Sequence, residues 1–522
     1  MHAQRKWLWS LLAGLTSGAA GLALAELAAL LVAPQASPLL AVGSLVIDLA
    51  PPPVKDAVIA LFGINDKAFL IGVLIVLIAV VAAGAGRLEL SAPPWGTVAL
   101  AVLGAVATVA VVTRAEASAL SAVPAVIGTA GACMLLRLTI GRLRAWSSQL
   151  QRAGVDSGRP AATAAAVSRR GFLLLVGGTA AGAIVVGIGS RLANAATVAV
   201  DAVRAAISLP RPATAAPPIP ASASLDVEGL TPLITPNADF YRIDTALRVP
   251  NVDPSEWRLR VTGMVEREIE LTFDELLALP LTETTITLLC VSNEVGGDLV
   301  GNAVWLGHPI RELLAQAGPL AGADMVLSRS VDGFTAGTPL EILLEEDRSS
   351  MLAVGMNGEP LPPEHGFPVR MVVPGLYGYV SATKWVTELE VTSFERSTAY
   401  WTDRGWSERG PVKIGSRIDV PARGMRPSAG TVAVAGVAWA QSTGIRGVEV
   451  QVDGGAWEPA RLATAISEDT WVQWVYEWEA AAGAHELSVR ATDATGELQS
   501  GAIVPVVPDG AEGWHTVSVT VG

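Results

Sequence analysis

Apolar residues dominate the first two hundred positions of the chain, whereas apolar and polar residues alternate in the remainder. A membrane-crossing helix needs roughly 20 apolar residues. Five uncharged runs meet this need: Trp7–Ala25, Ala68–Gly86, Ser91–Thr113, Ala117–Leu136 and Gly171–Ser190. A further apolar piece, Leu39–Ala50, is too short to span and is predicted to lie along the membrane interface. The pattern predicts an all-α transmembrane domain of five helices over residues 1–200.

The basic residues between these runs predict an orientation, because short loops rich in Lys and Arg stay in the cytoplasm. Ten of them fall on one side if the N-terminus is inside: Arg5, Lys6, Arg87, Arg137, Arg142, Arg144, Arg152, Arg159, Arg169 and Arg170. Five crossings then place the rest of the chain outside a cell membrane. The pair Arg169-Arg170 before an apolar run also resembles a twin-arginine export signal, which would imply export of a folded, cofactor-loaded protein. Anchoring by positive charge explains the same pair.

A Pro/Ala-rich linker is predicted over residues 201–225, which include the sequence SLPRPATAAPPIPASAS. Beyond it, alternation in WRLRVTG predicts a strand. Thr272 and Glu275 have the spacing of a capping box and open a short predicted helix over residues 273–279. A second helix is predicted from about residue 309 to 317, ending at Gly318. These mixed elements predict an α+β domain over residues 226–410.

Only strands are predicted beyond Pro421. Alternating valines lead into an Asp453-Gly454 turn, and WVQWVYEWEA and HELSVRATD read as further strands. Strands of this length and spacing are typical of an immunoglobulin-like β-sandwich, here predicted over residues 411–522. The Cys–Trp–Cys pattern of antibody domains is absent from the sequence, so the expected similarity is one of architecture.

Charge and cysteine usage exclude several classes of protein. A net charge of −13 argues against a nucleic-acid partner, because phosphate binding needs clustered Lys and Arg. Two cysteines, Cys133 in an apolar run and Cys290, do not predict a disulfide framework, and the sequence has no zinc-like cluster. None of the five histidines falls in a predicted span, which excludes a bis-histidine haem within the helices.

Cys290 lies in TLLCVSNEVGG, where an apolar run turns into a glycine-rich loop. A buried core cysteine is the simplest interpretation of such a residue. Its surroundings favour another one, since TPNADFYRIDTALRVPNVDPSEWRLRVTG, VWLGHPIRELL and HGFPVRMVVPGLYGYVSATKWV occur around it in a fixed order before the all-β segment. As an ordered set, these motifs resemble the sulfite oxidase family of molybdopterin-dependent oxidoreductases. The resemblance covers the whole chain beyond the linker.

The resemblance implies that Cys290 is the one protein thiolate on a molybdenum whose other ligands include the two dithiolene sulfurs of molybdopterin. A soft thiolate on a loop suits a thiophilic metal. Residues at positions that hold the pterin and its phosphate in the family are His365, Arg370, Ser381, Thr383 and Lys384. Basic and hydroxyl groups suit a phosphate through charge-assisted hydrogen bonds. As alternatives, His365 lies at the surface and Arg370 pairs with a carboxylate.

One family position carries unusual residues, and another corresponds to Thr335. A cofactor-contacting Arg-Asn-His in the family is replaced here by Arg242-Ile243-Asp244-Thr245, so Arg242, Asp244 and Thr245 are candidates by position alone. Thr335, in DGFTAGTP, corresponds to another wall of the family's site.

A second departure concerns the substrate. Sulfite oxidases follow the cysteine loop with a pair of arginines, whereas this chain has Asn293 and Glu294. A carboxylate beside the metal would repel anionic sulfite. A neutral S-oxide, an N-oxide or another small oxo acceptor is therefore favoured as the substrate. Asn293 and Glu294 are candidate catalytic residues; alternatively, they point away and cap the following turn.

The family's chemistry is oxygen-atom transfer, in which two electrons pass to or from a partner. No haem or iron–sulfur ligand set is expected, so a separate electron carrier is required, either a quinone-linked membrane enzyme or a cytochrome. The family's sandwich domains pair subunits, and a homodimer through residues 411–522 is the corresponding expectation. Two other functions remain open: a reductase of S-oxides or N-oxides on the same scaffold, and a non-catalytic cell-surface binding module. The helical region is expected to anchor the chain.

Overall fold

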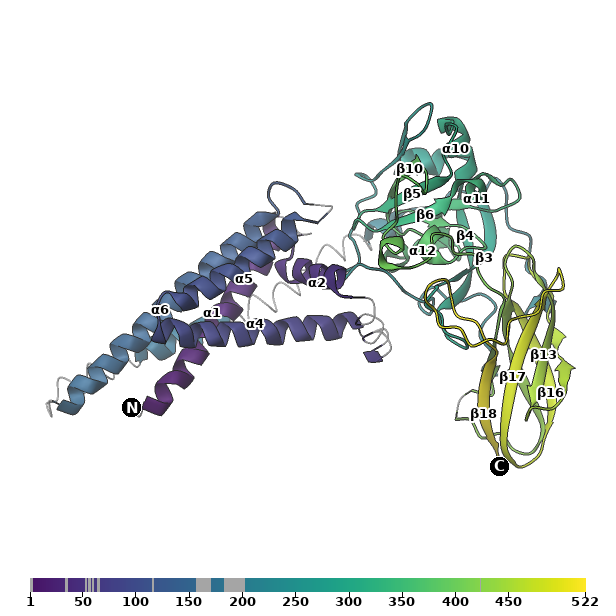
Figure 1. Ribbon diagram of the computed structural model, residues 1–522. Coiled ribbons are helices and arrows are strands. Elements are labelled where there is room, and N and C mark those ends of the chain that lie inside the picture. Colours follow the sequence, from purple (N-terminus) through teal and green to yellow (C-terminus); the bar gives the residue numbers. More distant parts are fainter. Residues whose placement is uncertain are drawn as a thin grey trace. The chain divides into compact units, whose positions relative to one another are not determined.

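The computed structural model describes residues 3–32, 36–51, 54, 58, 61–62, 66–114, 117–155, 170–182, 202–422 and 424–522. The chain divides into two compact units (Figure 1). One comprises residues 1–199 with 246–248, and the other comprises residues 200–245 with 249–522.

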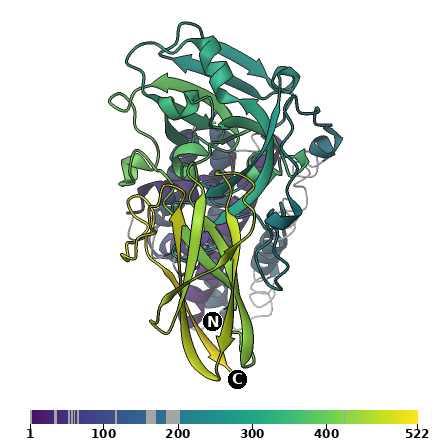
Figure 2. The ribbon, with the colours of Figure 1, turned by 90° about the vertical axis from the view of Figure 1, so that its right-hand side faces the viewer.

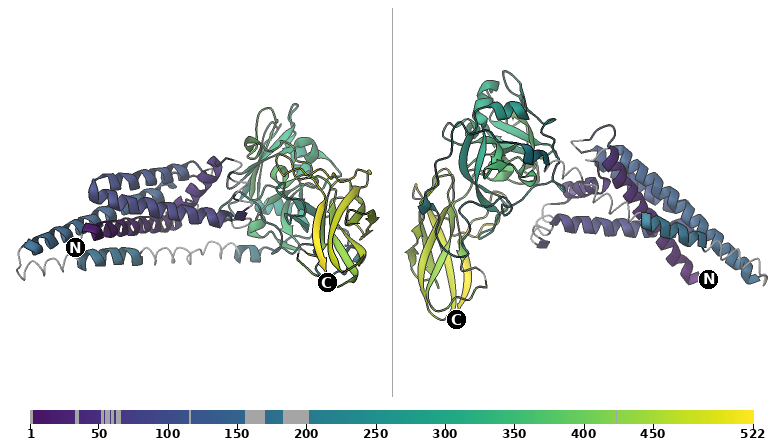
Figure 3. Two further views of the ribbon diagram at one scale, coloured as in Figure 1. Left: turned by 60° about the horizontal axis from the view of Figure 1, so that its bottom comes forward. Right: turned by 180° about the vertical axis from the view of Figure 1, so that it is seen from behind.

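Four helices in the described part of the first unit are long and apolar enough to cross a membrane. They are α1 (Ala3–Val32), α4 (Asp66–Ser91), α5 (Trp95–Val112) and α6 (Ala122–Val155). Both α1 and α5 pack against α4 and α6 (Figure 3). The short apolar segment expected at the interface is α2 (Pro38–Leu49). These helices confirm an apolar, all-α N-terminal region.

Helix bounds differ from the predicted spans where prolines and arginines lie. α5 begins at Trp95, not at residue 91, because Pro94 directly precedes it. α6 begins at Ala122 and continues beyond the predicted end, through Arg137 to Val155, since an arginine ends an apolar run without ending a helix. Of the fifth predicted span, residues 171–182 are helical, and residues 183–190 lie outside the described part. The count of five spans therefore stays a prediction.

Small residues allow the helices of this bundle to approach closely. A Cβ atom on Gly14 would lie 2.0 Å from the Ala82 carbonyl oxygen, and one on Gly128 would lie 2.6 Å from the Ala25 Cβ. The buried Glu89 carboxylate accepts hydrogen bonds from the amide and the hydroxyl of Thr97, at 2.9 and 3.0 Å. Glu89 thereby provides an acceptor for the first turn of α5, where backbone N–H groups lack partners within the helix.

Two five-stranded sheets form the first part of the second unit. One has the order β2-β1-β10-β5-β6, and the other has the order β3-β4-β7-β8 with β9 paired to β7. Their strands are β1 (Arg258–Gly263), β2 (Ile269–Thr272), β3 (Thr282–Leu289), β4 (Val300–Pro309), β5 (Met325–Ser330), β6 (Thr335–Pro339), β7 (Met351–Met356), β8 (Glu359–Pro360), β9 (Arg370–Val372) and β10 (Val386–Thr392). The helices are α9 (Phe273–Ala278), α10 (Ile310–Ala317), α11 (Leu340–Leu344) and α12 (Gly378–Ser381), with 3-10 turns η2 (Ala221–Ala223), η3 (Pro363–His365) and η4 (Thr402–Arg404).

Local signals in this region give the structures expected of them. β1 covers the predicted strand, and α9 begins with a complete capping box between Thr272 and Glu275. α10 ends at Gly318, whose φ of 69° lies in the left-handed region that favours glycine. The mixed sheets and short helices confirm the α+β prediction.

The C-terminal part is built of two four-stranded sheets, β11-β12-β16-β15 and β14-β13-β17-β18 (Figure 2). The strands are β11 (Gly415–Val420), β12 (Gly430–Trp439), β13 (Ile445–Val452), β14 (Trp457–Pro459), β15 (Arg461–Leu462), β16 (Val472–Ala480), β17 (Gly483–Asp493) and β18 (His515–Val521). Trp474 of β16 and Val489 of β17 lie in one shared hydrophobic core. The predicted Asp453-Gly454 turn follows β13 directly.

Part of the predicted linker is attached to the α+β region. The Ala213 amide donates to the Leu281 carbonyl, and the Glu283 amide donates to the Thr214 carbonyl, both at 2.8 Å. Ala223 is fully buried in the core. The described part of the segment is helical over residues 202–206 and forms the 3-10 turn η2, and backbone hydrogen bonds dock Ala213 and Thr214 beside β3.

Candidate functional site

Cys290 is the first residue after β3 and is buried, with 9% exposure. Its amide donates to the Leu299 carbonyl at 3.0 Å, which closes the loop that follows it. The Asn293 side-chain oxygen accepts the Leu299 amide at 2.8 Å, while Glu294 is exposed. These contacts match the turn-capping alternative for Asn293, and catalytic roles for Asn293 and Glu294 stay predictions.

A carboxylate and two cations meet beside this loop. The Lys384 ammonium donates to the Asp244 carboxylate at 2.6 Å and to the Glu364 carbonyl at 3.1 Å. Arg242 Nε donates to the same Asp244 oxygen at 2.8 Å. Asp244, in the run that replaces the family's Arg-Asn-His, thus links two segments far apart in the sequence.

Arg370, on β9, is a buried cation with 5% exposure. Its Nη1 donates to the His365 carbonyl at 3.1 Å, and its guanidinium lies 5.1 Å from the centroid of the Trp305 ring. No carboxylate of the described residues lies within ion-pair distance of it. Burial lowers the Arg370 pKa to about 10, so the group remains charged at neutral pH. The pairing alternative for Arg370 is not observed.

His365 is also buried, in contrast to the surface alternative. Its Nε2 lies 2.9 Å from the Asn237 carbonyl, so this nitrogen carries the proton. Burial, together with the charges of Arg370, Lys384 and Arg242, lowers the His365 pKa to about 4. The imidazole is therefore neutral at physiological pH.

The charged groups around Cys290 shift one another's pKa values. Burial lowers the pKa of Lys384 to about 8, with Arg370 and Arg242 acting in the same direction and Asp244 opposing them. Burial raises the pKa of the Cys290 thiol, while hydrogen bonds from Ser292 and the Lys384 charge lower it. The thiol, Lys384, Arg370 and His365 thus share one electrostatic neighbourhood.

Two tyrosines belong to this neighbourhood that the sequence reasoning missed. Burial raises the pKa of Tyr241, the charge of Cys290 acts in the same direction, and Arg370 opposes them. Burial also raises the pKa of Tyr377, which is 5% exposed, and Cys290 contributes to this shift. Tyr241 directly precedes Arg242 in a motif already singled out, so its position was the available signal.

Four predicted hydroxyl residues make contacts within the protein instead. Ser381 Oγ donates to the Tyr377 carbonyl at 3.0 Å, and Thr383 Oγ1 lies 2.7 Å from Ser328 Oγ. Thr335 Oγ1 accepts the Tyr400 amide at 3.0 Å. Thr245 Oγ1 donates to Asp332 at 3.3 Å. Roles for Ser381, Thr383, Thr335 and Thr245 at a cofactor stay predictions.

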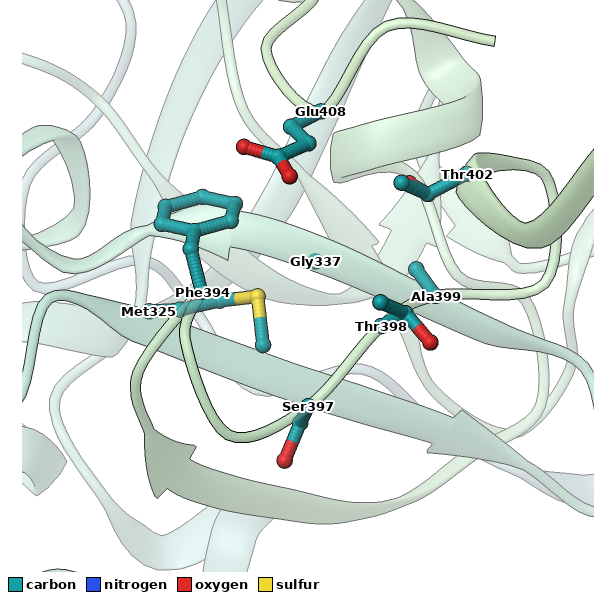
Figure 4. A pocket seen from close by; sticks show the side chains of 8 residues that line it. All are labelled: Met325, Gly337, Phe394, Ser397, Thr398, Ala399, Thr402 and Glu408. Atoms are coloured by element: carbon teal, nitrogen blue, oxygen red, sulfur yellow. The ribbon is translucent and has the colours of Figure 1, made fainter. Parts of the chain in front are cut away.

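A separate small pocket lies over β5 and β6 (Figure 4). Its lining residues are Met325, Gly337, Phe394, Ser397, Thr398, Ala399, Thr402 and Glu408. The space between them is too narrow to admit a water molecule, and none of the candidate site residues lines it. This pocket therefore has no part in the site around Cys290.

Comparison with known proteins identifies the domain that carries this site. Residues 246–401 match the oxidoreductase molybdopterin binding domain, which defines the class of protein. Mitochondrial sulfite oxidase of Mus musculus is 31% identical over 368 residues, covering 60% of this chain and 65% of the relative. An uncharacterized oxidoreductase of Bacillus subtilis is 36% identical over 158 residues, covering 30% of this chain and 76% of the relative. The chain belongs to the sulfite oxidase family of molybdopterin oxidoreductases.

One solved structure with a similar arrangement is the sulfane dehydrogenase SoxCD from Paracoccus pantotrophus. It matches with a TM-score of 0.49 and 24% identity over 57% of this chain and 85% of that one. The chain spans slightly less than two thirds of the mammalian sulfite oxidases, 65% of the mouse protein and 62% of the human one.

The side chains around Cys290 fit a cofactor that carries a phosphate. Lys384 and the exposed Arg242 pair with the Asp244 carboxylate, whereas the buried Arg370 guanidinium has no carboxylate within ion-pair distance among the described residues. Buried charges without partners are costly, and an anionic ligand would offset that cost. The thiol at the end of β3 is the soft donor that a thiophilic metal requires.

Proposed function

We propose that the chain is a membrane-anchored, extracytoplasmic molybdopterin oxidoreductase that transfers an oxygen atom at a molybdenum held by Cys290. One observation carries this proposal: the buried Cys290 thiol shares its surroundings with the buried Arg370 guanidinium, which has no carboxylate partner among the described residues. A thiolate for a metal and a cation for a phosphate thus lie within one neighbourhood.

Each residue has a defined part in holding the cofactor. Arg370 and Lys384 bind its phosphate by charge, and Asp244 orients Lys384 through their 2.6 Å hydrogen bond. His365, neutral and held by its bond to Asn237, offers its other ring nitrogen to the pterin as an acceptor. When bound, molybdenum–molybdopterin supplies the two-electron, oxygen-transfer chemistry.

Burial of Cys290 matters for its protonation. Burial alone favours the neutral thiol, whereas the Ser292 hydrogen bonds and the Lys384 charge favour the thiolate. A metal deprotonates a coordinating thiol outright. The protein therefore supplies a thiol that is shielded from water by burial and that a bound metal would deprotonate.

The substrate is proposed to be a small neutral S-oxide or N-oxide, and the direction of catalysis its reduction. This choice rests on the sequence, because the arginine pair that follows the cysteine loop in sulfite oxidases is replaced here by Asn293 and Glu294. The test compares loaded enzyme with reduced viologen plus dimethyl sulfoxide or trimethylamine N-oxide against enzyme with sulfite plus ferricyanide. Turnover with sulfite alone would contradict this choice.

The N-terminal helices and the C-terminal sheets complete the proposal. Five spans from a cytoplasmic N-terminus would place the catalytic unit outside, where a quinone-linked enzyme or a cytochrome exchanges electrons with it. The two C-terminal sheets and their shared core support an immunoglobulin-like sandwich. A homodimer through residues 411–522 belongs to the same proposal.

The decisive experiment measures molybdenum and pterin in the full chain purified in detergent from molybdenum-replete cells. Cys133→Ala and Cys290→Ala form a matched pair, because they are the two free cysteines of the chain. About one molybdenum per chain is expected in the wild type and in Cys133→Ala. In Cys290→Ala, the spectroscopic signature of a thiolate ligand is expected to disappear.

Absence of molybdenum and pterin from the wild type would contradict the proposed redox function and favour a cell-surface binding module. Unchanged spectra in Cys290→Ala would remove Cys290 from the metal while leaving the cofactor in place.

A further inference from the structure

The C-terminal sheets contact the strand that leads into Cys290. β3 is the edge strand of its sheet, and Thr287 lies on it, three residues before Cys290. The Thr287 amide donates to the Asp469 carbonyl at 3.0 Å, and the Trp471 amide donates to Thr287 Oγ1 at 2.9 Å. Gln441 Nε2 donates to the Thr287 carbonyl. Unpaired edge groups are thus satisfied by the C-terminal part of the same unit.

The same part of the chain contacts the loop on the other side of Cys290. Arg417, on β11 and 8% exposed, donates from Nη1 to the Gly297 carbonyl at 2.8 Å. Its Nε pairs with Asp419 at 2.6 Å, which fixes the guanidinium. A charge-assisted hydrogen bond of this kind is stronger than a neutral one.

His515 packs against the adjoining residue of the loop. A Cβ atom on Gly296 would lie 2.2 Å from the His515 ring, so only a glycine allows this contact. His515 Nδ1 accepts the Ile418 amide at 3.0 Å and therefore carries no proton. Burial and the Arg417 charge lower the His515 pKa, in agreement with a neutral ring.

We propose that Arg417 and His515 of the C-terminal sheets are positioning residues that, together with the Thr287 contacts, hold the Cys290 loop in place from both sides. The role as a ligand rests on the proposed function, but the fixation of the loop does not. Cys290 lies between two anchor points, Thr287 and Gly296–Gly297, and both are bound by residues beyond position 410. The C-terminal sheets therefore shape the candidate active site in addition to any role in dimerisation.

Local opening of the loop is the quantity that these contacts control. Loss of one buried, charge-assisted hydrogen bond is expected to raise the opening constant about tenfold or more. Because Cys290 is buried, opening exposes its thiol, and the rate of its alkylation reports the change directly.

The experiment uses the full chain in detergent, produced in cells that cannot make molybdopterin, and measures alkylation of Cys290 by iodoacetamide with peptide mass spectrometry. Arg417→Ala is expected to react about tenfold faster than the wild type. Arg417→Lys, which keeps a donor, is expected to restore most of the protection. Arg490→Ala is the matched control, since Arg490 lies in the same sheets but pairs with Glu449 and stacks on Trp457, away from the loop.

Gln441→Met tests the other anchor point and serves if Arg417→Ala does not fold, because it removes the donor to the Thr287 carbonyl. The same acceleration is expected. Alkylation rates equal to those of Arg490→Ala, in either the Arg417→Ala or the Gln441→Met protein, would overturn the proposal.

A second readout connects the loop to the metal. In loaded protein, Arg417→Ala is expected to alter the Mo(V) electron paramagnetic resonance signal, whereas Arg490→Ala is expected to leave it unchanged. A wild type without molybdenum would refute the proposed function alone, because the alkylation rates still decide whether the C-terminal sheets hold the loop.

Discussion

Arg370 shows how one buried residue can oppose stability and serve binding. It lies among carbonyls and an aromatic ring, and no carboxylate of the described residues lies within ion-pair distance of it. An unpaired buried charge destabilises a fold, because its desolvation is not repaid. Such an arrangement persists where a ligand supplies the missing charge.

Replacing Arg370 is therefore predicted to act in opposite directions on binding and on stability. Arg370→Met is expected to lower the molybdenum and pterin content more than tenfold, since truncating one partner of a buried charge pair costs about 2–5 kcal/mol. In cofactor-free protein, the same change is expected to leave the melting temperature equal or higher. Arg329→Met, on a half-exposed arginine paired with Glu388, is the control and should retain the cofactor. Normal cofactor content in Arg370→Met would contradict the assignment.

Asp469 gives a pH-dependent prediction at the same scale. Burial and the neighbouring Glu468 raise its pKa to about 6, above the value of about 3.9 for an unfolded chain. The folded state therefore binds more protons between these values, and the stability that the protonated carboxyl contributes is lost as pH rises through about 6. Asp469→Asn is expected to raise the free energy of unfolding by about 1–2 kcal/mol at pH 7.5 and to change it little at pH 4.

Asp253 is a control for this measurement, because its pKa is lowered by folding, whereas that of Asp469 is raised. It accepts hydrogen bonds from the amide and hydroxyl of Ser255, which lower its pKa. Asp253→Asn should thus not stabilise the protein at pH 7.5. Thermal melts of both variants at the two pH values check the prediction, and a pH-independent effect of Asp469→Asn would contradict it.

The sequence predicted which residues lie around Cys290 better than it predicted which residues contact one another there. Cys290, His365, Arg370 and Lys384 were named from ordered motifs, and the structure brings them into one neighbourhood. The sequence did not show that Asp244 would bind Lys384, because that contact joins residues 140 positions apart. The partners of Thr287 and Gly297 were missed for the same reason.

At the scale of elements, local signals predicted individual helices and strands well. The capping box before α9 and the glycine after α10 depend on neighbouring residues only, and both were confirmed. Strand pairing depends on distant segments, so the parallel pairing of β1 with β10 had no local signal. The helix α6 exceeded its predicted length because hydropathy reports the apolar part of a helix, not its hydrogen bonding.

The loop after β3 offers a test of a single element. Gly296 has φ of +78°, and a Cβ there would clash with His515, whereas Gly454 has φ of +69° with open space around it. Gly454→Ala isolates the cost of the left-handed conformation, about 1 kcal/mol. Gly296→Ala is expected to cost about 3 kcal/mol or more, because either the ring or the loop must move as well. Equal shifts in melting temperature for Gly296→Ala and Gly454→Ala would show that the His515 ring moves aside at no measurable cost.

At the scale of the whole molecule, the two units have different surfaces. Large apolar side chains are exposed along α4, among them Val76 at 63% and Val80 at 63%, as expected for helices that face lipid. The second unit exposes few such residues along its described length. A chain without the helices is therefore expected to be soluble.

The position of the cut decides whether such a chain is stable. Arg204 donates to the Pro360 carbonyl at 3.0 Å and pairs with Glu359 at 2.9 Å, and Thr214 and Ala223 are docked on the same unit. A chain of residues 202–522 keeps these contacts, whereas one of residues 226–522, cut at the end of the predicted linker, loses all of them. The shorter chain is expected to be less stable by about 3 kcal/mol or more, since several hydrogen bonds and a buried side chain are removed. Denaturant unfolding of both chains measures the difference. Equal stabilities would mean that residues 202–225 behave as the plain linker that their composition predicts, and a higher value for the longer chain would make them part of the folded unit.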